Sequence, residues 1–478
     1  MENEVPRYTR QLDQLARLGM RTTGSAAHTE LVDSIAAELD ALGLAVQRDR
    51  QVLDRWEAGP GSVGLDVGGA PVAVASAWPY SGVTGQDGVT GRLVRLTGRR
   101  LRWAEAAEAI AVVEVAHLRV PSAAVIASWD GGAALGPTVS NPVLSAELGG
   151  VDLAAARAAG VLAVIAVWDG LPDAVATGQY VPFTQPYRDL PALWAPESER
   201  VRLREAAERG ATARLRLTAE LTPGVPTDTV WAVSPGTVAG ESVVVVTHTD
   251  GSNEVEENGH IGLLALARDA VAAPHDRTIV FAAVTGHLRI PAVTEHGQAT
   301  TVWLRAHPEL WDGRPGGMRA VAGLAIEHLG ARAFAVDPTT GAYRPTGALE
   351  PELLYATTAE LATLVRLSWP EVDGGPVPVA KPAPLIHFGE GEPLFQHRIP
   401  AVALVTAPEY LLAELTERAV DVGVLARQVD GFRELQRRLA STGLPADALG
   451  TVRPPSKLRK GVAALRALAS VRAQLRRG

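Results

Sequence analysis

Residues 242–266 read SVVVVTHTDGSNEVEENGHIGLLAL, and this stretch decides the fold. Its run of valines predicts a buried strand, and its apolar end predicts a helix. Between them lie His248, Asp250 and the acidic pair Glu256 and Glu257. Open α/β sheets build ligand sites from such a strand, loop and helix, at the carboxyl ends of their strands. Histidine and carboxylates gathered at that edge predict a metal site of the zinc type.

The composition limits which partners are expected. The chain has 478 residues, 47% of them apolar and 21% charged, so two or three globular domains are expected. A net charge of −8 gives no reason to expect binding to nucleic acid or to an anionic membrane. The expected partner is a small-molecule or peptide substrate. Because there is no cysteine, any metal must be held by His, Asp or Glu.

Both ends of the chain are charged. The N-terminal stretch MENEVPRYTRQLDQLARLG has no apolar core of the signal-peptide type, and no apolar run approaches ~18 residues, which together predict a cytoplasmic protein. Residues 451–478 carry eight Arg and Lys and no acid, with an apolar stripe at helical spacing. We expect a helix docked on the protein with a solvated basic face; a basic interaction tail is the alternative.

Strands separated by helices predict the main fold. After residue 226 they indicate an α/β protein with a mostly parallel mixed sheet, covered by helices on both faces. The expected strands are Thr229–Val233, Val243–Val246, Thr278–Val284, Val321–Ile326 and Ala401–Val405. Residues 80–222 have a different character, with short strands such as Ala123–Ala127 and Leu162–Val167, and indicate a compact α+β insertion. The predicted domains are 1–79 with 223–478, and 80–222.

Several segments together resemble a known family. In chain order they are RTTG (21–24), HTD (248–250), ENG (257–259), TGH (285–287), AIEHLG (325–330) and RIPAVAL (398–404). This order resembles the zinc aminopeptidases of metallopeptidase family twenty-eight, which also contains the glutaminyl cyclases. The insertion, with AARAAGVLAVI (155–165) and LPALW (190–194), resembles a protease-associated (PA) domain. The resemblance implies a zinc-aminopeptidase fold with an inserted PA-like domain.

The resemblance also implies roles for single residues. It makes His248 a metal ligand and Asp250 the residue that orients the site. Glu257 stands where the family has a bridging aspartate, and Glu327 where it has a later aspartate ligand. Two family ligands are missing, because Leu288 replaces a glutamate and no histidine follows the strand that ends near residue 405.

The paired zinc ions of the family are therefore not expected here. The remaining metal ligands are His248, Glu257 and Glu327, for one zinc ion at most, with water in the open position. The catalytic candidates are Glu256, His287 and Asp250, and the substrate-binding candidates are His328, Glu390 and Glu392. We expect His248, Glu257, His287 and Glu327 to share one pocket, on the order of 10 Å across. The alternative is a metal-free acidic pocket that does acid–base work or binds a cationic ligand.

Three functions remain open from the sequence. The first is a hydrolase acting on an amide or peptide-like bond, a reaction class that the family resemblance supplies. The second is a metal-free acyl-transfer or cyclising enzyme of the same fold. The third is a non-catalytic binding protein that retains the pocket. The metal content of the protein separates the first function from the other two.

Overall fold

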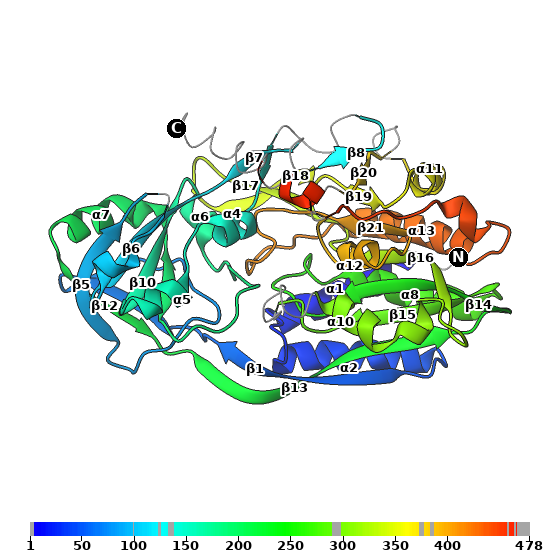
Figure 1. Ribbon diagram of the computed structural model, residues 1–478, viewed down its shortest axis with the longest axis horizontal. Coiled ribbons are helices and arrows are strands. Elements are labelled where there is room, and N and C mark those ends of the chain that lie inside the picture. The colour runs from blue at the N-terminus through cyan, green and yellow to red at the C-terminus, as the bar shows by residue number, and fades with distance from the viewer. Residues whose placement is uncertain are drawn as a thin grey trace.

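The computed structural model describes residues 4–98, 100–122, 126–131, 138–288, 298–371, 377–382, 387–456, 458–462 and 465. The molecule is elongated and has two units, each built around its own sheet (Figure 1). The larger unit lies on the right in Figure 1 and contains both N-terminal helices. The smaller unit lies on the left and contains most of the strands between β1 (Gln47–Glu57) and β13 (Glu220–Ser234).

Over the described ranges, the larger sheet has nine strands in the order β1-β13-β15-β14-β16-β21-β19-β20-β8. The further bounds are β14 (Val238–His248), β15 (Arg277–Val284), β16 (Arg319–Ile326), β21 (Ala401–Val405), β19 (Leu353–Ala356), β20 (Val379–Lys381) and β8 (Ala127–Ser128). Strands β15, β14, β16 and β21 are parallel neighbours. Antiparallel pairs flank them on both sides, through β13 and β19. The sheet is therefore mixed with a parallel centre, as the sequence predicts.

Helices cover both faces of this sheet because its strands are apolar on both. Val243 and Val245 pack into one core with α1 (Val5–Leu18), α2 (Ala26–Ala41), α8 (Gly259–Ala272), α11 (Ala359–Ser368) and α13 (Val422–Leu439). Val244 and Val246 pack into a second core with α10 (Ala299–Ala306) and α12 (Gly391–Gln396). Successive side chains of a strand point to opposite faces, so a continuous apolar run suits a doubly covered sheet. The predicted fold class is confirmed.

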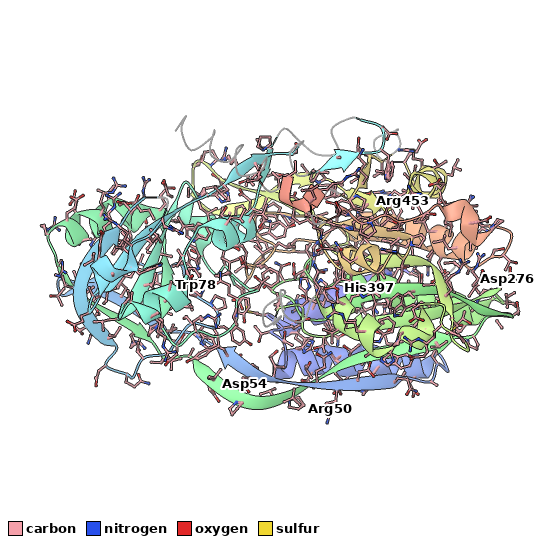
Figure 2. All side chains as sticks on the ribbon, in the orientation of Figure 1. Arg50, Asp54, Trp78, Asp276, His397 and Arg453 are labelled. Carbon is pink, nitrogen blue, oxygen red and sulfur yellow. The ribbon has the colours of Figure 1, made fainter. Side chains whose placement is uncertain are left out.

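The smaller sheet has, among the described residues, eight strands in the order β3-β2-β12-β5-β6-β10-β11-β4. Their bounds are β2 (Val63–Val67), β3 (Ala70–Val72), β4 (Ser76–Ala77), β5 (Val89–Leu96), β6 (Ile110–Ala116), β10 (Ala163–Asp169), β11 (Ala192–Ala195) and β12 (Thr212–Leu217). The predicted strand Leu162–Val167 corresponds to β10, which pairs with β6 and β11 inside this sheet. Stacked rings of Trp78, Trp168 and Trp194 fill one side of its core, and Figure 2 labels the first of them.

The strand pairing places the start of the smaller unit earlier than the predicted boundary at residue 80. Strands β2, β3 and β4 all precede that residue and pair in the smaller sheet. An alternating stretch with glycine turns suits either sheet, so only its partners reveal which one it joins. Strand β8 lies within the predicted insertion but pairs with β20 of the larger sheet. The treatment of the smaller unit as a separate PA-like domain stays a prediction.

A two-stranded ribbon joins the units. Strands β1 and β13 pair antiparallel from Gln47 with Trp231 to Glu57 with Glu220. Arg50 and Asp54, both on β1, mark the ribbon along the lower edge of the molecule (Figure 2). The chain enters the smaller unit on one strand of the ribbon and leaves it on the other.

The remaining described elements are short. They are β7 (Arg119–Pro121), β9 (Thr138–Ser140), β17 (Arg332–Val336), β18 (Tyr343–Leu349), α4 (Pro142–Leu148), α5 (Leu153–Ala158), α6 (Asp173–Ala176) and α7 (Arg200–Glu208), with 3-10 turns at 103–106, 197–199, 308–310 and 446–449. The predicted strand Ala123–Ala127 falls largely outside the described residues, as does most of the predicted basic C-terminal helix. Within the described part of the chain, no helix has both the length and the apolar character needed to cross a membrane.

Candidate active site

His248 is the last residue of β14, and its side chain is fully buried. Its Nδ1 lies 2.9 Å from the carbonyl oxygen of Asp250. A carbonyl only accepts, so we assign the proton to Nδ1, and Nε2 is the nitrogen left over. Nε2 has no hydrogen-bond partner among the described residues and lies 3.6 Å from Oε2 of Glu327. Metal-binding histidines are usually oriented in this way, through the nitrogen that does not bind the ion.

Glu327 and His328 directly follow β16. The Nδ1 of His328 lies 2.8 Å from the carbonyl oxygen of Thr406, just past the end of β21. Its Nε2 is buried without a hydrogen-bond partner among the described residues. That atom lies 3.9 Å from Oε2 of Glu327 and 3.5 Å from Oε2 of Glu256. Burial lowers the pKa of His328 even though both carboxylates oppose the shift, which leaves the ring neutral.

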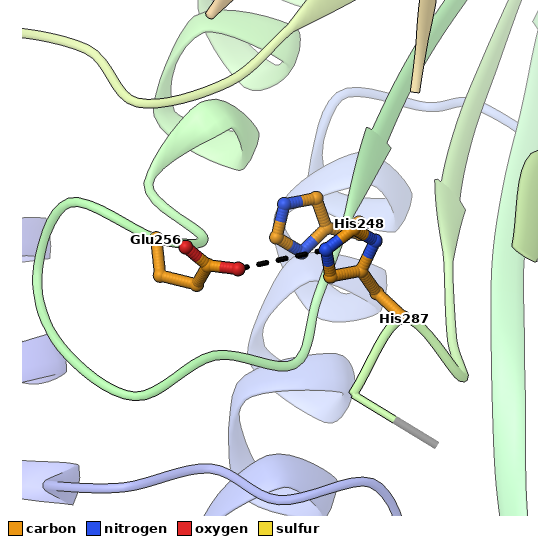
Figure 3. Close-up of side chains that lie close together, drawn as sticks. All are labelled: His248, Glu256 and His287. Atoms are coloured by element: carbon orange, nitrogen blue, oxygen red, sulfur yellow. Dashed lines mark ion pairs between the residues drawn. The ribbon is translucent and has the colours of Figure 1, made fainter. Parts of the chain in front are cut away.

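His287 connects two buried carboxylates. It follows β15, and its ring stacks on that of His248 with 4.0 Å between centroids. Its Nδ1 lies 2.8 Å from Oε1 of Glu390, and its Nε2 lies 3.5 Å from Oε1 of Glu256 (Figure 3). Burial lowers the pKa of His287, but the two carboxylates outweigh burial and raise it well above the usual value. The raised pKa favours a ring with a proton on each nitrogen, one toward each carboxylate.

Asp250 fixes the backbone at His287, and Gly389 leaves room for Glu327. The Asp250 carboxylate accepts hydrogen bonds from the Thr23 hydroxyl at 2.5 Å and from the backbone N–H groups of His287 and Leu288 at 3.1 and 2.8 Å. Gly389 has a φ of 74°, and a Cβ there would lie 2.5 Å from the Glu327 carboxylate. The missing side chain therefore leaves room for Glu327.

Glu257 lies beside the cluster but is bound to a different partner. Its carboxylate pairs with the guanidinium of Arg21, and both side chains are fully buried. The carboxylate also presses against Gly251, where a Cβ would lie only 1.6 Å from Oε2. Burial raises the pKa of Glu257 to about 7, although Arg21 opposes the rise. The Arg21 contact therefore favours the charged form of this carboxyl group, which burial disfavours.

Two groups of three ligand atoms, each within 4.8 Å of one another, occur among the described residues. They are His248, Glu256 and His287, and His248, Glu327 and His328. Both groups include His248, whose Nδ1 already bonds the carbonyl oxygen of Asp250, so a metal ion in either group would use its Nε2. Two ions therefore cannot occupy both groups at once. The carboxyl groups of Asp250, Glu256, Glu257, Glu327 and Glu390 are all at most 1% exposed. Arg21 pairs with Glu257, and although burial lowers the pKa values of His287 and His248, the carboxylates outweigh burial and raise both. A metal ion would add further positive charge among these five carboxyl groups.

A cavity of about 200 Å³ opens beside the cluster. Its polar side is formed by residues of the cluster, namely Glu256, His287, Glu327 and His328. Its apolar walls include Leu144 and Phe183, from the segment between β1 and β13, and Leu411 and Leu412, from the loop after β21. The Phe183 ring stacks on His287 with 5.6 Å between centroids. Residues of both units therefore enclose the cavity beside the cluster.

No protein-family model matches the sequence, and no curated protein matches it. Solved structures match over nearly the whole chain. A zinc aminopeptidase from Bacillus subtilis gives a TM-score of 0.62 at 16% identity, covering 94% of this chain and 98% of that one. An aminopeptidase from Aneurinibacillus sp. strain AM-1 gives 0.59 at 14%, covering 91% and 93%. A Peptidase M28 precursor from Shewanella amazonensis gives 0.57 at 16%, covering 95% and 100%. This chain has the zinc-aminopeptidase fold.

Within the aminopeptidase fold, the structure brings most of the predicted site residues together. The cluster consists of His248, Glu256, His287, Glu327, His328 and Glu390. Three predicted residues stand apart from it. Asp250 lies behind the cluster, and Glu257 is held by Arg21. The carboxylate of Glu392 accepts hydrogen bonds from Gln298 and Gln396 at 2.9 and 3.3 Å instead. The roles assigned to these residues stay predictions.

Three residues that shape the site were not found from the sequence. Arg21 lies in the RTTG segment, which pointed to the family but not to an ion pair. The side-chain amide of Asn253 donates to backbone carbonyls of residues 410, 411 and 413, which ties the loop of Glu256 to the cavity wall. Phe183 comes from the inserted segment. All three act through partners distant in the chain, and no local pattern encodes such contacts.

Proposed function

We propose that this protein is a zinc-dependent hydrolase of amide or peptide bonds, with a single zinc ion. The fold supports the reaction class, because the neighbours that share it include a zinc aminopeptidase and a second aminopeptidase. The donor atoms at the sheet edge support the metal. The substrate we propose is a peptide or an aminoacyl amide that enters the cavity enclosed by both units.

The proposed zinc ligands are Nε2 of His248, Nε2 of His328 and Oε2 of Glu327. The carboxylate oxygen lies 3.6 and 3.9 Å from the two nitrogens. Ligands placed about 2.1 Å from a tetrahedral zinc ion lie roughly 3.4 Å apart, so a small contraction brings all three onto one ion. Two histidines, one glutamate and one open position form a known catalytic arrangement. His287 fits less well, because each of its nitrogens already faces a carboxylate.

The other residues of the cluster supply proton transfer. Zinc bound here would act as a Lewis acid and make water acidic enough to react near neutral pH. Oε2 of Glu256 has no hydrogen-bond partner among the described residues, so it is placed to accept a proton as general base. Nε2 of His287 lies 3.5 Å from the other oxygen of Glu256, and it can donate a proton to the leaving amine. Glu390 orients His287 through Nδ1.

One observation carries the proposal. Nε2 of His248, Nε2 of His328 and Oε2 of Glu256 are buried, lie close together and have no hydrogen-bond partner in the described part of the chain. Buried polar atoms nearly always have a partner, and an isolated unpaired one costs roughly 1–3 kcal/mol. Acceptor atoms this close repel one another, and a cation bound between them would remove that repulsion.

Metal analysis combined with an activity panel tests the proposal. We expect one zinc per chain, hydrolysis of aminoacyl p-nitroanilides, loss of activity with a chelator and recovery with zinc. His328→Ala should lose both zinc and activity, while Glu205→Gln, exposed on helix α7 of the smaller unit, should retain both. Activity that survives complete metal removal would favour the metal-free acyl-transfer enzyme. One bound zinc without turnover of any substrate in the panel would favour a binding protein.

A further inference from the structure

We infer that Arg21 is a positioning residue that restricts the site to one metal ion, by holding Glu257 outside the metal cluster. The inference rests on the proposed function, because it assumes that the cluster binds zinc. It goes further in assigning a role to a residue that touches neither the proposed ligands nor the cavity beside them.

Arg21 is fixed from two sides of the molecule. It lies between α1 and α2, and its Nη1 donates to the carbonyl oxygen of Leu15 at 2.9 Å and to that of Gly19. Its Nη2 donates to the carbonyl oxygen of Asn253 at 2.7 Å and contacts Glu257. Its backbone pairs with Gly251 in both directions, at 2.8 and 3.1 Å. The guanidinium is fully buried, so it has no alternative position in water.

The Glu257 carboxylate can pair with Arg21 or bind a metal ion, but it cannot do both. The resemblance to the aminopeptidase family places Glu257 where a carboxylate bridges two ions. Its longer side chain instead folds against Gly251, where no Cβ obstructs it, and meets the guanidinium. In a two-metal site a second cation neutralises the bridging carboxylate. Here the guanidinium of Arg21 neutralises Glu257 instead. Because Arg21 is part of the chain, it cannot be exchanged for an ion from solution.

The number of zinc ions bound by Arg21→Met tests the inference. Metal-free protein would be titrated with zinc at pH 8, with stoichiometry read by elemental analysis. Wild type should bind one equivalent. Arg21→Met should bind two, because Glu257 then offers free lone pairs near Glu256, whose Oε2 has no hydrogen-bond partner among the described residues. Arg21→Met combined with Glu257→Leu should return to one, because the carboxylate that receives the second ion is gone.

Arg277→Met is the matched control. Arg277 is also buried, pairs with Glu241 at 2.7 Å and donates to carbonyl oxygens of Leu439, Ser441 and Leu444. It begins β15, at the end of the parallel strands opposite His287. Loss of this buried arginine should cost stability but leave one zinc per chain. A second zinc that also appears in Arg277→Met would show that loosening of the fold, not release of Glu257, creates the site.

Several outcomes overturn the inference separately from the proposed function. Wild type that binds no zinc refutes both. Wild type with two zinc ions, or a folded Arg21→Met with only one, refutes the role of Arg21 and leaves a zinc hydrolase standing. If Arg21→Met does not fold, Glu257→Gln decides: its unpaired guanidinium should weaken binding of the single zinc about tenfold by repulsion. Unchanged zinc affinity in folded Glu257→Gln contradicts the inference.

Discussion

Glu256 and Glu257 are adjacent in the chain, yet their carboxylates have different partners. Glu256 faces His287 and His328 on the cavity side, whereas Glu257 meets Arg21 behind the loop. Asn253 fixes this division, because its side-chain oxygen accepts the backbone N–H groups of residues 255 and 256 at 2.9 and 3.2 Å. A rigid turn can thus present one acid to a substrate and keep the next one for structure.

The first prediction concerns Glu256 itself. Glu256→Gln removes the proposed general base but none of the proposed zinc ligands, so kcat/KM should fall by about 10²–10⁴-fold. Zinc content, measured on the same preparation, should remain at one per chain. Loss of zinc in this variant would instead make Glu256 a ligand and favour the alternative group with His287.

The residue types at the site could be predicted, but their assignment could not. His248, Glu327 and His328 follow apolar strands, and parallel strand ends meet at one edge, so their convergence followed from the pattern. The predicted ligand Glu257 has the right type and place in the chain. Its orientation depends on Arg21, on Gly251 and on space for one extra methylene, which are tertiary contacts. His328 was predicted to bind substrate, and only its unpaired Nε2 indicates a ligand.

At the scale of elements, one carboxylate ties α7 to the smaller sheet. Glu114, on β6, accepts hydrogen bonds from Arg95 on β5 and from Arg200 and Arg204 on α7, at 2.7 to 3.1 Å. Burial alone would raise the pKa of Glu114, but the arginines outweigh it and lower the pKa to about 2. An acid with a depressed pKa stabilises the fold above its unfolded value near 4.5, and that contribution is lost as pH falls toward 2.

Glu114→Gln should therefore lower the free energy of unfolding on the order of 1 kcal/mol at pH 7. The difference from wild type should shrink as pH falls below about 4.5, because the unfolded wild-type chain then takes up a proton that the folded chain binds only near pH 2. Urea unfolding at a series of pH values measures it. Glu205→Gln, on the same helix and more than half exposed, is the control and should change little at any pH. A gap of constant size down to pH 3 would contradict the prediction.

Elements were easier to predict than the sheets they join. The valine run of β14 is long and apolar enough to require burial on both faces, and the structure has it at the centre of the larger sheet. Strands β2 to β4 carry no such information, because a short alternating strand suits any sheet edge. Strand β2 pairs with β12 and β4 pairs with β11, which both come more than a hundred residues later in the chain. Pairing over such distances is set by packing, which a local pattern does not contain.

At the scale of the whole molecule, zinc should stabilise the fold. The proposed ligands follow β14 and β16, and His328 is anchored to the end of β21, so one ion would link three central strands. A ligand that binds only the folded state adds about 2.7 kcal/mol at a hundredfold excess over its Kd. Calorimetry should show a lower Tm after chelation and recovery with zinc but not with magnesium. An unchanged Tm would argue against a zinc site in this position.

The ribbon of β1 and β13 has a mechanical consequence. Two hydrogen-bonded strands resist stretching and in-plane bending, but a narrow ribbon twists readily. The units also contact each other where the backbone of Gln179 pairs with Ala413 and where Leu412 lies in the core of the smaller unit, so we expect their relative motion to be limited to a small twist about the long axis of the ribbon. Such torsion would slide Phe183 sideways across the face of His287 and leave the proposed zinc ligands, which belong to the larger unit, undisturbed. Access to the cavity could then vary without any change in the geometry that performs the chemistry.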